Sequence, residues 1–216
     1  MSRRIIAWDI ETVPQPLDSF SYRQQRRHDL MLNDEARRTP EADRDDLSRK
    51  VRSLHPMLGW ICCISCVRLG AGDQPAEPKS YTAHLRGHES GLLSQFWADI
   101  AKVGPALWVT YNGKRFDADW LRVRSAAHGI VPSRRDILDR YPFRHEPHCD
   151  LSRVFDCRSG LDDLCDLLGV TSPKGEMHGG IVAEAVAGGR IEDVAAYCEA
   201  DVRATLECYV RLRGQL

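Results

Sequence analysis

The sequence predicts an α/β fold in which a mixed β-sheet is flanked by helices. In the first half of the chain, short apolar runs typical of buried strands alternate with segments of helical apolar periodicity. Helical patterns then dominate the second half. Strands that interleave with helices in this way are typical of a layered α/β domain.

The expected elements follow from these patterns. The apolar runs predict strands at 3–9, 59–69, 79–83, 105–111 and 151–155. Apolar residues at helical spacing predict helices at 89–103, 117–129, 161–169, 181–187 and 191–213. The two strands before the first of these helices are joined by a turn-rich loop, which favours antiparallel pairing between them.

The length of 216 residues suits one domain, which we take as 1–216. Within it, the segment at about 14–56 is polar, charge-rich and helical in pattern, so we interpret it as an insertion. Two interpretations of this segment remain open. It is either a solvated helical addition or an arm that lies over a nucleic-acid strand.

Composition limits the classes of partner. The formal net charge is −1, so no global basic field indicates nucleic acid, and such a partner must be held locally or through bound metal. No stretch approaches the roughly 20 apolar residues of a membrane span, and the apolar run after Arg4 is too short for a signal peptide. We therefore expect a cytoplasmic protein with no membrane partner, whose eight cysteines are free thiols.

Cys63 and Cys66 form a C-x-x-C pattern, which can bind zinc or act in redox chemistry. A zinc site needs a second pair of ligands at suitable spacing, and the later sequence does not supply one. A redox pair belongs at a strand-to-helix turn, whereas this pair lies inside the apolar run at 59–69. We expect both residues to pack as small hydrophobes, with a Cys/His zinc module as the alternative.

Asp9 and Glu11 are the most informative pair of residues in the chain. They close the first apolar run with one residue between them, so on a strand both carboxylates point to the same face. Two neighbouring anions are costly unless a positive group lies between them. Hard divalent cations, Mg²⁺ or Mn²⁺, are the usual partners of such oxygens. The alternative is a strand end whose acids face water.

Two further acids occupy unusual positions. Asp201 points in nearly the same direction as the apolar residues Val194 and Cys198 of the last helix, with Tyr197 one turn before it. A core-facing acid must be paired or metal-bound, and an arginine at the rim is the alternative partner. Asp117 begins a helix directly after a buried strand, where it could also serve as a first-turn acid.

In this order the motifs resemble those of the DEDD superfamily of 3′→5′ exonucleases. Asp9 and Glu11 resemble the first motif of this superfamily, and Asn112, Phe116 and Asp117 resemble the second. The Tyr197-x-x-x-Asp201 run resembles the third motif in its tyrosine variant. The chain is similar to stand-alone bacterial proteins related to the proofreading domain of family B DNA polymerases. Further similarity lies at 54–56 and 174–180, where His178 stands in place of an acid often found in such relatives.

The resemblance implies a ribonuclease-H-like fold and a two-metal phosphodiesterase. Asp9, Glu11, Asp117 and Asp201 would bind two Mg²⁺ or Mn²⁺ ions, with Asp9 shared between them. Tyr197 would orient the attacking water, and the product would be a nucleoside 5′-monophosphate.

The expected partner is single-stranded nucleic acid, with DNA 3′ ends as the first choice. Ile10, Thr12 and Phe116 would pack on the last nucleotide, and Asn112 would hydrogen-bond near its sugar or phosphate. Lys174 would bind a phosphate or remain a solvated loop lysine. The alternatives are an exoribonuclease that trims RNA or short oligonucleotides, and a non-catalytic nucleic-acid-binding module.

Overall fold

The structure is a computed structural model that describes residues 3–154, 160–173 and 178–216. In these residues five strands form one sheet in the order β3-β2-β1-β4-β5. The strands are β1 (Arg4–Pro14), β2 (Gly59–Arg68), β3 (Lys79–Thr82), β4 (Ala106–Thr110) and β5 (His148–Asp150). β2 is antiparallel to both β1 and β3, whereas β4 is parallel to both β1 and β5. The mixed sheet predicted from the sequence is confirmed.

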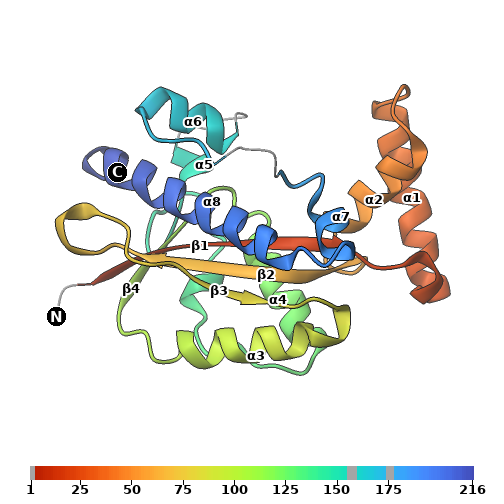
Figure 1. Cartoon of the computed structure of the whole chain (residues 1–216), viewed down its shortest axis with the longest axis horizontal. Helices are drawn as coiled ribbons and strands as arrows, with labels where there is room; N and C mark the ends of the chain where they lie inside the picture. Colours follow the sequence, from red (N-terminus) through yellow and green to blue (C-terminus); the bar gives the residue numbers. More distant parts are fainter. Residues whose placement is uncertain (1–2, 155–159, 174–177) are drawn as a thin grey trace.

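Helices cover both faces of this sheet (Figure 1). α3 (Glu89–Ile100) and α4 (Asp117–Ala127) lie on one face. The other face carries the long helix α8 (Ile191–Leu212) together with α5 (Leu151–Val154), α6 (Leu161–Leu168) and α7 (Val182–Ala187).

The side-chain alternation of β1 assigns its residues to these two layers. Ala7 packs in the cluster that contains the apolar residues of the later part of α8, and the Asp9 carboxylate contacts Cys198 of the same helix. Because successive side chains of a strand point to opposite faces, Asp9 and Glu11 lie on the same side as Ala7. Both carboxylates are therefore directed toward α8.

The polar segment at 14–56 contains two helices, as its pattern predicted. α1 (Tyr22–Arg38) begins with a capping box made by Ser21 and Gln24, and the Asp43 side chain caps α2 (Arg44–Ser53). The two helices pack on each other at one end of the sheet, and α2 also packs on β1.

Two element predictions were wrong in their bounds. The first strand continues beyond residue 9 to Pro14, so Asp9 and Glu11 lie within β1 and not at its tip. Pairing with β2 extends the strand, and a bulge lies between Glu11 and Thr12. At 151–154 the chain is helical, because the Asp150 carboxylate accepts hydrogen bonds from the N–H and hydroxyl of Ser152 and so caps α5. Residue 155 lies outside the described residues.

The seven cysteines among the described residues are free thiols, as expected, and Cys157 lies outside them. Cys63 and Cys66 both belong to β2, and Cys63 is fully buried. This placement agrees with a packing role. Among the helices that the structure describes, none combines the length and the apolar character that crossing a membrane requires.

Candidate active site

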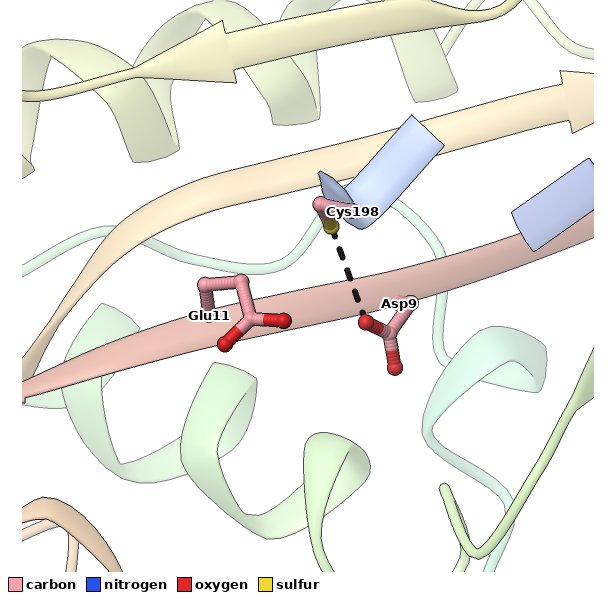
Figure 2. Close-up of side chains that lie close together, drawn as sticks. All are labelled: Asp9, Glu11 and Cys198. Carbon is pink, nitrogen blue, oxygen red and sulfur yellow. Dashed lines mark hydrogen bonds between the residues drawn. The ribbon is translucent and has the colours of Figure 1, made fainter. Parts of the chain in front are cut away.

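Asp9 and Glu11 project from β1 beneath α8, where Cys198 meets them (Figure 2). One ligand atom from each of these three residues lies within 4.8 Å of the others. The Cys198 thiol donates a hydrogen bond to Asp9 Oδ2 with a sulfur–oxygen distance of 3.6 Å. In the part of the chain that the structure describes, no other group of three His, Cys, Asp or Glu residues is arranged to hold a metal ion.

Asp117 approaches Asp9 and Glu11 from the start of α4, and its charge raises the pKa of Asp9, which burial raises most. Asp117 is the first residue of α4, is 2% exposed and follows the turn that leaves the carboxyl end of β4. Its Oδ1 accepts a hydrogen bond from the backbone N–H of Ile10 at 3.2 Å. In the turn, Asn112 has a φ of +65°, and a Cβ on Gly113 would lie 2.5 Å from the Thr110 side chain. The turn therefore requires glycine at 113 and a residue that tolerates positive φ at 112.

Asp150 supports this turn, and sequence reasoning missed it. Its carboxylate is 1% exposed and accepts hydrogen bonds from the backbone N–H groups of Asn112 (2.7 Å) and Lys114 (3.0 Å). Its charge also raises the pKa of Asp117. In the sequence, Asp150 is recognisable only as an acid directly before a short helix. Many acids that merely cap a helix N-terminus occupy the same position, so this pattern does not single out Asp150.

α8 contributes the remaining members of the cluster. Tyr197 and Asp201 line a pocket of about 210 Å³ together with Asp9, and Tyr197 is hydrogen-bonded to Asp201. The spacing of four residues places both side chains on one face of the helix. The structure thus brings together the four acids and the tyrosine that the sequence selected. Their roles in catalysis and metal binding stay predictions.

The electrostatics of the cluster follow from burying several acids together. Burial raises the pKa of Asp9 well above its usual value, and the charges of Asp117, Asp201 and Glu11 raise it further. Burial and the charge of Asp201 likewise raise the pKa of Glu11. The pKa of Asp117 rises to about 7, mainly through burial. Carboxylates that repel one another in a buried site fit a divalent cation, which would stabilise their ionised forms.

A larger groove has Thr12, the residue after Glu11, in its wall. It has a volume of about 950 Å³ and lies between α2 and the 178–187 segment. The Thr12 hydroxyl donates a hydrogen bond to the Ser53 carbonyl at the end of α2 (2.6 Å). Apolar side chains such as Leu54 and Ile181 line the groove alongside Arg49.

The remaining residues predicted to bind substrate lie at different depths. The Ile10 side chain is 4% exposed and belongs to the core, while Phe116 is half-buried against Trp120 with ring centroids 5.8 Å apart. Asn112 is exposed. Lys174 lies outside the described residues. The substrate contacts of these residues stay predictions.

The mixed sheet with helices on both faces, and with Asp9 and Glu11 on its central strand, is a ribonuclease-H-like fold. Residues 54–215 match the model of the family described as "Predicted 3'-5' exonuclease related to the exonuclease domain of PolB", and the chain belongs to this family. A search of curated proteins found no match.

Comparison with solved structures supports the same fold. The chain is similar to the family B DNA polymerase of the hyperthermophilic archaeon Pyrobaculum calidifontis, with a TM-score of 0.67 and 18% sequence identity. The match covers 99% of this chain and 25% of the polymerase chain. It therefore includes almost all of the sheet and helices described above, whereas the family match begins after Asp9, Glu11 and the α1–α2 segment.

Proposed function

We propose that this protein is a metal-dependent 3′→5′ exonuclease that hydrolyses phosphodiester bonds at the 3′ ends of single-stranded DNA and releases nucleoside 5′-monophosphates. One observation carries the proposal. In a chain of this exonuclease family, acids from three distant segments converge in one cluster, in which Asp117 is buried and Asp9 and Asp201 are half-buried, and the pKa values of Asp9, Glu11 and Asp117 are raised there.

Asp9, Glu11, Asp117 and Asp201 would hold two Mg²⁺ or Mn²⁺ ions. Bound ions of this kind polarise the phosphate, lower the pKa of water and stabilise charge on the leaving oxygen. The carboxylates contribute by being buried and fixed before the ions bind. The hydrogen bond from the Ile10 N–H to Asp117 is one such constraint.

Tyr197 would orient the water that attacks the phosphorus in line with the leaving 3′ oxygen. Burial first, and then the charge of Asp201, raises the pKa of this phenol above its ordinary value near 10. At neutral pH the hydroxyl therefore keeps its proton and is a poor general base. Its hydrogen bond to Asp201 favours a positioning role.

The last nucleotide would lie between the acids and the adjoining groove. Thr12 follows Glu11 in β1 and lines the groove, so it is well placed to contact a nucleotide bound there. Phe116 would offer a ring for stacking, which contributes about 1–3 kcal/mol per base. The Ile10 side chain would pack under the last nucleotide from its position in the core. Asn112 would bind near the sugar or phosphate of that nucleotide, and Lys174 would bind a phosphate. A cytoplasmic location is part of this proposal.

The decisive experiment uses a 5′-labelled single-stranded oligonucleotide with Mg²⁺, Mn²⁺ or EDTA. We expect a ladder that shortens from the 3′ end, needs the metal and is absent with an Asp201→Asn preparation. Parallel digestion of DNA and RNA of the same sequence separates the deoxyribonuclease from the exoribonuclease. Binding without cleavage in a metal-replete preparation would overturn the proposal and favour a binding module.

A further inference from the structure

The loop at 139–144 presents two aromatic side chains to solvent. Tyr141 is 55% exposed and Phe143 is 84% exposed, and their rings meet edge to face with centroids 5.9 Å apart. The Arg144 guanidinium lies 5.5 Å from the centre of the Tyr141 ring. We call Tyr141, Phe143 and Arg144 the aromatic platform.

A buried lysine holds the backbone of this platform. Lys114 is 3% exposed, and its Nζ donates hydrogen bonds to the carbonyl oxygens of Tyr141 and Arg144, both at 2.6 Å. The same Nζ lies 3.6 Å from a carboxylate oxygen of Asp139, which also pairs with Arg144. A lysine is rarely buried to this extent unless it is paired. These anchors keep both rings at the surface.

The anchor also connects the platform to the candidate active site. Lys114 belongs to the turn between Asn112 and Asp117, and its backbone N–H donates to Asp150. The Asp150 carboxylate also accepts a hydrogen bond from the Asn112 N–H at the start of this turn (2.7 Å). The platform therefore lies beside the turn that positions one of the four acids.

We propose that the aromatic platform stacks unpaired bases of a single-stranded nucleic acid whose 3′ end lies at the acid cluster. This inference rests on the proposed function and extends it to the nucleotides that precede the last one. Every base has a face that stacks on an aromatic ring, so such a platform accepts any sequence. The Arg144 guanidinium lies over the Tyr141 ring, and its side chain is 55% exposed although it also pairs with Asp139. It therefore presents positive charge beside the rings, which complements the phosphate backbone.

The test compares a long substrate with a minimal one. Phe143→Ala and Tyr141→Ala are assayed on single-stranded oligothymidylate and on the p-nitrophenyl ester of thymidine 5′-monophosphate, which lacks a preceding base. We expect kcat/KM for the oligonucleotide to fall about 10-fold, within the range of one base–aromatic stack, while hydrolysis of the ester is unchanged. Leu85→Ala, which truncates an exposed apolar residue elsewhere, is the control and should leave both rates unchanged.

A binding measurement separates failure of this inference from failure of the proposed function. Fluorescence anisotropy follows labelled oligothymidylate on Asp201→Asn protein, with and without Phe143→Ala. Weaker binding with the second substitution supports the platform even if no preparation cleaves DNA. Equal binding, no binding, or an equal fall in the rates for both substrates would overturn it.

Discussion

The backbone N–H of Ile10 donates a hydrogen bond to Oδ1 of Asp117, 107 residues further along the chain, with a nitrogen–oxygen distance of 3.2 Å. This contact joins the central strand to the start of α4. It also directs the Asp117 carboxylate toward the strand that carries Asp9 and Glu11. Part of the candidate metal site is thus constrained by the protein itself, which is the kind of preorganisation that favours catalysis.

The acids and the tyrosine should differ in their importance for cleavage. We expect Asp9→Asn and Asp201→Asn to abolish cleavage of single-stranded DNA, because each removes a predicted metal ligand. Tyr197→Phe should slow cleavage by less than about 100-fold, the lower end of what a general base contributes. Rates from labelled oligonucleotides provide the measurement.

The control for this series is Tyr209→Phe, which alters a tyrosine of the same helix that packs in the core. It should leave the rate close to that of the wild type. Complete loss of cleavage in Tyr197→Phe, in a protein that melts normally, would contradict the positioning role.

Asp117→Asn should stabilise the metal-free protein at alkaline pH. Burial raises the pKa of Asp117 in the folded state from its ordinary value of 3.8 to about 7, so the folded state holds this proton more tightly than the unfolded state. The free energy of unfolding therefore falls as pH rises between these values, and the variant avoids this loss, which is at most about 4 kcal/mol. Urea unfolding in EDTA near pH 8 and near pH 4 measures the difference in unfolding free energy between Asp117→Asn and the wild type. This difference should be present only at the higher pH.

Adding Mn²⁺ should reverse this ranking, because the wild type gains stability by binding the ion and the variant lacks one of its ligands. An Asp117→Asn protein that is destabilised in EDTA near pH 8 would argue against the raised pKa.

His148 should make stability fall as the solution is acidified. Burial lowers its pKa to about 4. The neutral ring donates from Nδ1 to the Asp139 carbonyl (3.0 Å) and accepts at Nε2 from the Thr110 hydroxyl (2.7 Å). As pH falls, the unfolded state binds this proton before the folded state does. His148 therefore contributes up to about 3 kcal/mol to the free energy of unfolding above pH 6.5, and this contribution is lost as pH falls toward 4.

The measurement is the difference between the pH–stability curves of the wild type and His148→Asn in urea. Taking the difference cancels the opposite slope that the raised carboxylates contribute. Parallel curves would rule out this assignment.

The buried ion pair between Glu89 and Arg124 should be essential for stability. Glu89 is fully buried and accepts hydrogen bonds from Arg124 Nε (2.9 Å), His128 Nε2 (2.7 Å) and the Ile61 backbone N–H (2.8 Å). Arg124→Met leaves a buried charge without its main partner, so unfolding free energy should fall by about 3–5 kcal/mol.

Arg37→Met is the matched control, because the ion pair between Arg37 and Asp34 is exposed to solvent. This substitution should lower the free energy of unfolding by less than about 1 kcal/mol. Similar losses in both variants, measured by urea unfolding, would show that burial of the Glu89 pair is not what makes it important.

Local patterns predicted most of the elements and the main candidate residues. Apolar runs located β2, β3 and β4, and helical periodicity located α3 and α8, because both signals repeat over short distances. The strand that precedes α5 was misplaced because it is only three residues long, too short to show a period. Asp150 and the burial of Lys114 were missed for a related reason, since their hydrogen-bond partners come from segments distant in sequence.

The sequence by itself determined which faces the chemical groups occupy. The period of a strand places Asp9 and Glu11 on one side, and the period of a helix places Tyr197 and Asp201 on one side. Only the tertiary structure decided that these faces meet, that Asp117 accepts a hydrogen bond from the Ile10 backbone, and that the acids lie close enough to raise one another's pKa values. The physical reason is that desolvation and charge repulsion depend on distances through space, which no local pattern of residues encodes.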